Sequence, residues 1–285
     1  MYTAETLVKE SMDLISLPDV YIRLRSVINS PDYAMSDVAQ VIVHDPAVTS
    51  RLLKLVNSAY FGLPNTIDTM THAVNMLGAQ QVHDLVLSTV VVDSFSGFSN
   101  EQFNIYDFWY KSVYCAVTAR LLAYNCKDLD TERPFIEGLL HDVGHMLMYQ
   151  FMPDESLAAA EVASSSLQPL YLAEREALGF DYADIGARLM NEWKLPASLQ
   201  EVTRCQNEPE QSSEYQLETC ILHIASAITE HAIAEQPVSA ESLMVKPICW
   251  QLTGLKADDM QGIKTEVDQQ VMMVMNMLFS QRKSA

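Results

Sequence analysis

Apolar residues recur at steps of three and four through most of the chain, which is the spacing that gives an α-helix one buried face. The pattern is clear at Val38, Val41, Ile42, Val48, Leu52, Leu53 and Val56. The alternation of apolar and polar residues that marks a strand is scarce. Nine glycines and eleven prolines among 285 residues also leave little turn material for a sheet of many strands. The sequence therefore predicts an all-α fold.

Start and stop signals divide this pattern into separate helices. Ser36 stands at an N-cap position, Pro46 follows Asp45 in a first turn, and Gly78 ends the segment 69–77. The expected helices cover residues 3–15, 18–29, 36–44, 46–58, 68–77, 79–94, 105–126, 131–151, 154–164, 168–178, 181–193, 196–206, 214–234, 240–252 and 257–281.

A small, polar segment, Ser94–Asn100, separates two apolar helices near the middle of the chain. Such a composition is typical of a connection between lobes. We therefore expect a single module, 1–285, with an N-terminal helical lobe over 1–97 and a C-terminal lobe over 98–285. Tyr60 and Phe61 are expected to pack into a core.

The charge balance excludes some classes of protein. Lysine plus arginine number 18 against 37 aspartates and glutamates, a formal charge of −19. A carboxylate excess repels phosphate backbones, so we expect no nucleic-acid binding. We also expect no membrane contact and a cytoplasmic location, because no segment has the ~18 uninterrupted apolar residues of a spanning helix or an apolar signal core. Five cysteines without a Cys-x-x-Cys pair indicate reduced, buried thiols.

A series of motifs in one order resembles the HDOD family, the HD-related output domains. The motifs are Leu17-Pro18, the run from His44 to Ala59, Ala73 to Gly78, Trp109 with Ser112, Gly138 to Gly144, Leu178 to Asp181, Gly186-Ala187 and Trp193-x-Leu195-Pro196. The match runs from about Leu14 to Ser226. The resemblance implies a two-lobed helical HDOD fold whose C-terminal lobe is a degenerate relative of HD-type metal-dependent phosphohydrolases.

His141 and Asp142 are the candidate site at the centre of this resemblance. They lie in the apolar stretch Phe135–Phe151, where a buried histidine and carboxylate need a hydrogen bond, a metal or a counter-charge. In the catalytic relatives, the pair binds a metal together with a histidine and a distant aspartate. The resemblance places those two positions at Lys111 and Ser226. The further histidines of two-metal relatives would fall at Tyr182, Gln206 and Asn207.

Two interpretations of this site remain open. Two ligands are fewer than the three of a catalytic zinc site, so we expect no metal or other cofactor. Lys111, in an internal ion pair, or a backbone group would then neutralise Asp142. Alternatively, His145 lies one turn after His141 on the expected helix, a spacing that can hold a metal. The His-Asp pair and His145, with His223 or Glu137, would then form a non-standard metal site.

The comparison of ligands favours a protein without catalysis, and the resemblance to the HDOD family implies a role in bacterial signal transduction. We therefore expect a non-catalytic regulatory protein that binds a signalling protein or a small ligand. The alternative is a metal-dependent phosphohydrolase of nucleotides or cyclic dinucleotides that uses His141, Asp142 and His145. A third interpretation is a homodimer formed through the methionine-rich segment 257–281.

Overall fold

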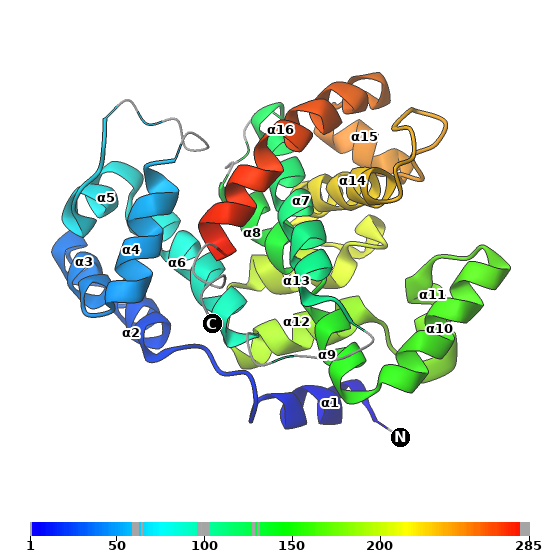
Figure 1. Ribbon diagram of the computed structural model, residues 1–285, viewed down its shortest axis with the longest axis horizontal. Helices are drawn as coiled ribbons and strands as arrows, with labels where there is room; N and C mark the ends of the chain where they lie inside the picture. The colour runs from blue at the N-terminus through cyan, green and yellow to red at the C-terminus, as the bar shows by residue number, and fades with distance from the viewer. Residues whose placement is uncertain are drawn as a thin grey trace. The chain divides into compact units, whose positions relative to one another are not determined.

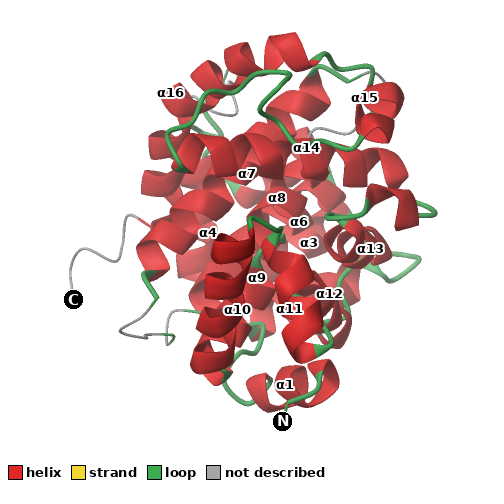
Figure 2. Ribbon diagram, turned by 90° about the vertical axis from the view of Figure 1, so that its right-hand side faces the viewer, coloured by secondary structure: helices red, strands yellow, loops and turns green. Residues whose placement is uncertain are grey.

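Helices account for the whole regular structure of the part of the chain that the computed structural model describes. That part comprises residues 2–58, 63, 65–95, 98, 103–126, 129 and 132–279. Within it there is no strand, as Figure 2 shows. The all-α prediction is confirmed. No helix in these ranges is long and apolar enough to cross a membrane.

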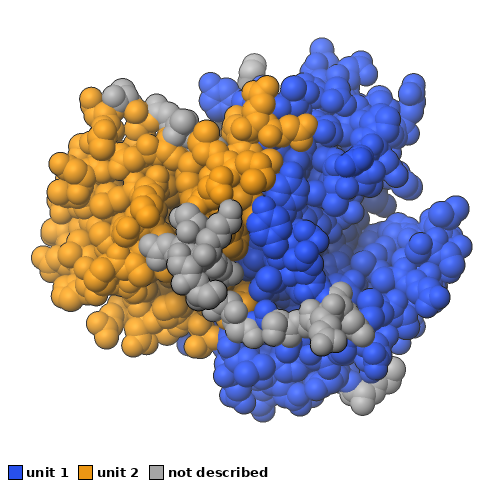
Figure 3. All heavy atoms as spheres, viewed as in Figure 1, with its two compact units in different colours: residues 1–15, 98–267 blue, residues 16–97, 268–285 orange. Residues whose placement is uncertain are grey.

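The helices form two compact units, coloured separately in Figure 3. One unit holds residues 16–97 and the end of the last helix, from Asp268; the other holds residues 1–15 and 98–267. In this division, residues 2–15 group with the residues that follow 98, and residues 268–279 group with residues 16–95.

The unit drawn orange in Figure 3 is helical in its described part, and the end of the last helix belongs to it. The helices are α2 (Asp19–Ile28), α3 (Met35–Val43), α4 (Pro46–Val56), α5 (Met70–Leu77), α6 (Ala79–Ser94) and the end of α16 (Met260–Phe279). Asp45 caps α4, because its carboxylate accepts from the backbone N–H groups of Ala47 and Val48, both at 3.0 Å. Pro46 occupies the first turn, as expected.

The unit drawn blue in Figure 3 carries the candidate site. Its helices are α1 (Ala4–Ser11), α7 (Ile105–Tyr124), α8 (Glu132–Leu140), α9 (Val143–Phe151), α10 (Pro153–Ser166), α11 (Leu170–Leu178), α12 (Tyr182–Glu192), α13 (Ala197–Cys205), α14 (Gln216–Ile233), α15 (Pro247–Thr253) and the start of α16. Helix α7 packs on α8 and α14, and α9 packs on α12 (Figure 1).

The helix expected over 131–151 is wrong as a single element. Residues 141 and 142 form a turn between α8 and α9. The ring Nδ1 of His141 donates to the carbonyl of Gly138 at 2.7 Å, and the backbone N–H of His145 donates to the carbonyl of Asp142. The break lets α8 pack on α7 while α9 packs on α12. His141 and His145 therefore do not share one face of a continuous helix.

The helix expected over 240–252 begins only at Pro247. Ser239 and Ser242 explain the late start, because each side chain accepts a hydrogen bond from the other residue's backbone N–H group. Such local bonds compete with helix formation. Leu243 and Val238 anchor this irregular segment in the core around α14 and α15.

The five cysteines are buried in the protein interior. All five are free and buried, and Cys115, Cys126, Cys220 and Cys249 belong to one apolar cluster built from α7, α14 and α15. The prediction that the thiols are buried is confirmed. Tyr60 and Phe61, and most of the segment 94–100 expected between the lobes, lie outside the described residues.

Candidate functional site

A buried polar cluster surrounds the turn between α8 and α9. Asp142 comes from the turn itself, Lys111 from α7, His145 from α9 and Glu174 from α11. Glu230, on α14, joins the cluster from its exposed edge. Helices widely separated in sequence therefore converge on one aspartate.

Two glycines allow these helices to approach each other closely. A Cβ atom on Gly138 would lie 2.6 Å from the Cα of Ala116, so α8 rests directly on the backbone of α7. A Cβ atom on Gly144 would lie 1.9 Å from the carbonyl oxygen of Tyr182, so α9 rests on the start of α12. Any other residue at either position would push the helices apart. These glycines bring the side chains of the cluster within bonding distance.

Asp142 pairs with a cation at each carboxylate oxygen. Its Oδ2 lies 3.3 Å from the Nζ of Lys111, and its Oδ1 accepts a hydrogen bond from the Nδ1 of His145. Lys111 has a second carboxylate partner, because its Nζ lies 2.6 Å from Oε1 of Glu230. The Glu230 side chain is 60 % exposed, whereas that of Asp142 is buried. The arrangement is the internal ion pair that the first interpretation requires.

His145 is bonded at both ring nitrogens. Its Nε2 lies 2.9 Å from Oε1 of Glu174, while Nδ1 faces Asp142. The ring also stacks on Tyr182, with the centroids 4.0 Å apart and the planes 15° from parallel. The backbone N–H of Tyr182 donates to Oε2 of Glu174 at 3.1 Å. Two carboxylates and an aromatic ring thus hold the imidazole in one orientation.

The charges of these residues follow from their partners. Burial alone would lower the pKa of Lys111, but the carboxylates of Asp142 and Glu230 raise it above its usual value. Burial would likewise lower the pKa of His145, and Asp142 with Glu174 instead raises it to about 10. Burial would raise the pKa of Asp142, but the nearby cations hold it well below its usual value. Lys111 and His145 are therefore cations and Asp142 an anion at neutral pH.

His141 differs from His145 because burial lowers its pKa. Its Nδ1 proton goes to Gly138, and its backbone carbonyl accepts the side-chain Nε2 of Gln206 at 2.8 Å. The carbonyl of Gln206 accepts in turn from Nδ1 of His223 at 2.7 Å, and Nε2 of His223 accepts from the backbone N–H of Lys246 at 3.2 Å. Both ring nitrogens of His223 are therefore engaged in hydrogen bonds with backbone groups next to the site.

The residues at Tyr182, Gln206 and Asn207, where the resemblance places further ligands, bond to other protein groups in this chain. Tyr182 donates its hydroxyl proton to Oδ1 of Asn207 at 3.0 Å, and Gln206 binds the backbone of His141. Ser226 forms no hydrogen bond or ion pair with the cluster in the described part of the chain. The contact from α14 comes instead from Glu230, one helical turn further along.

These residues do not fit a metal ion. Across the described residues, no group of three or more histidine, cysteine, aspartate or glutamate side chains has the arrangement of a metal site. An ammonium group has no lone pair to donate, and both ring nitrogens of His145 are already engaged by Asp142 and Glu174. His141, whose Nδ1 already donates a proton, would have to supply the one neutral nitrogen ligand beside two fixed positive charges. The geometry therefore favours a charge-balanced cluster over the metal site of His141, Asp142 and His145.

Sequence reasoning missed Glu174 and Glu230. A signal for Glu174 was present, because it shares the helical spacing of Leu170 and Leu178 and so places a carboxylate on a partly apolar face. Such a carboxylate needs a buried partner. No comparable signal marks Glu230, whose exposed side chain looks like any other solvated glutamate.

Comparison with known proteins shows which family the chain resembles. The chain is similar over 95 % of its length to a Shewanella amazonensis protein named "Putative phosphohydrolase", with 27 % identity, a TM-score of 0.71 and 97 % of that chain covered. It shares the fold of an HDOD domain protein of unknown function from Geobacter sulfurreducens, with 22 % identity, a TM-score of 0.71 and 96 % of each chain covered.

One curated relative also matches. It is an uncharacterized protein of Treponema pallidum (strain Nichols), 26 % identical over 205 residues, which are 71 % of this chain. The match spans only 39 % of that relative's length. The HDOD domain family itself matches residues 14–209, more than half of the chain and the whole of the buried cluster except Glu230. The chain therefore belongs to the HDOD family.

Proposed function

We propose that this HDOD protein is a non-catalytic regulatory module that acts by binding a partner protein or a small ligand. The observation that carries the proposal is the pairing of Asp142 with Lys111 and His145, one cation at each carboxylate oxygen. In a metal-dependent hydrolase, that carboxylate would supply lone pairs to the metal. In this chain, Lys111 and His145 already balance the negative charge that Asp142 would offer to a metal ion.

The alternative is a metal-dependent phosphohydrolase, and the name of the Shewanella amazonensis relative is the reason to test it. Such an enzyme needs a metal to activate water or to stabilise charge on a phosphoryl group. Binding a metal at Asp142 would require His145 to lose a proton and to turn away from Asp142 or Glu174. It would also bring a second positive charge close to the Lys111 ammonium.

A hydrolase screen tests the proposal. The full chain is assayed with nucleotide monoesters, cyclic dinucleotides and a chromogenic phosphodiester, each with added manganese, magnesium, zinc or ferrous iron. We expect no turnover above that of the Asp142→Ala variant. Turnover that requires a metal and disappears in Asp142→Ala would establish the hydrolase instead.

The double variant Lys111→His with Ser226→Asp provides a matched gain-of-binding control. It places a histidine and an aspartate at the two positions where the catalytic relatives carry them and removes the ammonium. We expect this variant to bind manganese more tightly than the unmodified chain in a calorimetric titration. Equal binding by the two proteins would argue against Lys111 as the group that replaces the cation.

A further inference from the structure

A hollow lies between α2 and α3, two helices that follow each other in the sequence and pack together (Figure 1). Its volume of about 310 Å³ falls at the lower end of the range of small-molecule sites. The residues that line it belong to one compact unit, the one drawn orange in Figure 3. They are Arg23 and Val27 from α2, and Asp37, Gln40, Val41 and His44 from α3 and its C-cap.

Helical spacing brings these side chains to the same place. Arg23 and Val27 are four residues apart on α2, so they lie on one face of that helix. Asp37, Val41 and His44 follow one another at steps of four and three along α3, so they also share one face. Each helix therefore presents a charged side chain and a valine to the hollow.

Arg23 and Asp37 carry opposite charges but do not pair with each other. Within the described part of the chain, the guanidinium of Arg23 forms no ion pair or hydrogen bond. The carboxylate of Asp37 accepts a hydrogen bond from the backbone N–H of Ala34 at 3.0 Å and has no cationic partner there. A guanidinium binds a carboxylate well, and a carboxylate binds an ammonium group. The hollow can therefore hold a molecule that carries both of these groups.

The rest of the lining favours an apolar group of small size. Val27 and Val41 are partly buried, and both offer aliphatic surface to the hollow. The ring of His44 is held in place, because its Nδ1 donates to the carbonyl of Gln40 at 2.6 Å. Asp37 would repel a phosphate group, and Arg23 would repel a diamine. A small zwitterion with an aliphatic part satisfies both charges and the valines.

We infer that the hollow between α2 and α3 binds a free amino acid with an aliphatic side chain. The carboxylate of the ligand pairs with Arg23, its ammonium group pairs with Asp37, and its side chain contacts Val27 and Val41. The inference rests on the proposed binding function and names a class of small ligand for it. The site lies in the unit that does not contain the cluster around Asp142.

Calorimetric titration of the full chain with leucine tests the inference. We expect saturable binding of one leucine per chain. N-acetyl-leucine lacks the ammonium group and leucine amide lacks the carboxylate, so each analogue should bind about tenfold more weakly than leucine. Glycine keeps both charges but has no aliphatic side chain, and it should also bind more weakly.

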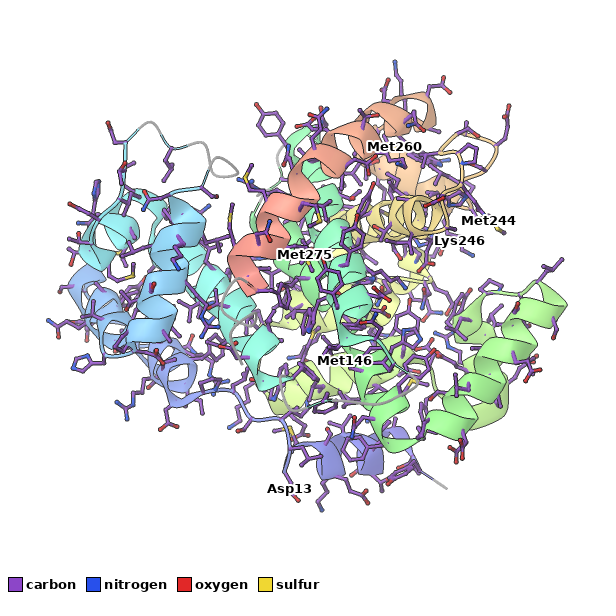
Figure 4. The ribbon with its side chains drawn as sticks, viewed as in Figure 1. Asp13, Met146, Met244, Lys246, Met260 and Met275 are labelled. Carbon is purple, nitrogen blue, oxygen red and sulfur yellow. The ribbon has the colours of Figure 1, made fainter. Side chains whose placement is uncertain are left out.

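Substitutions in the hollow assign the two charges. Arg23→Gln and Asp37→Asn should each weaken leucine binding by about tenfold. Both side chains are exposed, and asparagine can still accept from the backbone N–H of Ala34, so the two variants should remain folded. The control is Lys246→Gln, which removes one positive charge in the other unit and is labelled in Figure 4. It should leave leucine binding unchanged.

Three outcomes would overturn the inference. These are the absence of saturable leucine binding by the unmodified chain, equal binding of leucine and N-acetyl-leucine, and equal binding of leucine by Arg23→Gln and the unmodified chain. None of them bears on metal binding or hydrolysis, so the inference can fail while the non-catalytic assignment stands. A metal-dependent activity that disappears in Asp142→Ala would remove that assignment and leave the leucine titration unchanged.

Discussion

Asp142 shows how a buried charge is made stable in this protein. The carboxylate lies out of water, and each of its oxygens faces a cation, Lys111 or His145. Such an arrangement is stable only while both sides are present, because removing one partner leaves an uncompensated buried charge. Removing one partner of these ion pairs is therefore expected to cost more stability than removing one partner of an exposed pair.

Replacing Lys111 by methionine tests this dependence. We expect the free energy of unfolding to fall by about 3 kcal/mol, because Asp142 would lose one of its two counter-charges. Urea unfolding measures the change. Glu230→Gln is the control, since Glu230 is exposed and its pair with Lys111 should contribute less than about 1 kcal/mol. Equal effects of the two substitutions would show that Lys111 does not neutralise Asp142.

His145 makes the free energy of unfolding depend on pH in the alkaline range. Its folded pKa of about 10 lies above the ordinary value of 6.5, so its contribution to stability is complete below pH 6.5. That contribution is lost as the pH rises toward 10, by at most about 1.4 kcal/mol per pH unit. Urea unfolding between pH 6 and pH 10 measures the slope. His145→Gln should show a smaller slope, and an unchanged slope would mean that His145 is neutral in the fold.

Asp142 acts in the opposite direction on the acid side. Because the pKa of Asp142 is held below its ordinary value, its contribution is present above pH 3.8 and is lost as the pH falls through the folded pKa. The cluster therefore loses stability at both ends of the pH range and keeps it near neutrality.

At the scale of helices, two close contacts set the position of the site. Gly144 lets α9 rest on the backbone of Tyr182. A Cβ atom on Gly186 of α12 would have its tightest contact with a side-chain methyl of Thr203 at 3.2 Å, and the backbone nitrogen of Gly144 at 3.5 Å would be in ordinary contact. Both glycines lie in helices, Gly144 in the first turn of α9 and Gly186 in the interior of α12, so helix propensity disfavours alanine at neither position. The two substitutions therefore separate the effect of the helix contact from that of propensity.

Gly144→Ala is expected to destabilise the protein by about 3 kcal/mol, because the added methyl group cannot fit without moving α9 from α12. Gly186→Ala should change the free energy of unfolding by less than about 1 kcal/mol, since a methyl contact can adjust. Thermal or urea unfolding of both variants measures the difference. If the two alanines had the same effect, the close approach of α9 to α12 would be wrong.

The end of α10 allows a stabilising substitution. Leu167→Gly should raise the free energy of unfolding by about 1 kcal/mol, because glycine adopts the left-handed conformation without the cost that a Cβ atom imposes. Leu167→Ala keeps a Cβ atom, so it is the control and should give no such gain. A loss of stability in Leu167→Gly would mean that the leucine side chain packs usefully in the isolated protein.

At the scale of the whole molecule, the fold class could be predicted because helix periodicity is a local property. The single helix over 131–151 could not be corrected from the sequence, since the turn at His141 and Asp142 depends on contacts of α8 with α7 and of α9 with α12. The need of Asp142 for a counter-charge was predictable from burial, and Lys111 from the family resemblance. Glu230 could not be predicted as a member of the cluster, because it comes from a helix that lies more than 80 residues after Asp142 in the sequence.

The central claim is that protein cations occupy the place of a metal at Asp142, and the metal content of the purified chain tests it most directly. The full chain is produced in cells supplied with manganese, iron and zinc, purified without chelator and analysed by mass spectrometry of the elements. The account predicts only traces of metal, with the same content in Asp142→Ala. A stoichiometric metal ion in the unmodified chain that is lost in Asp142→Ala would contradict it.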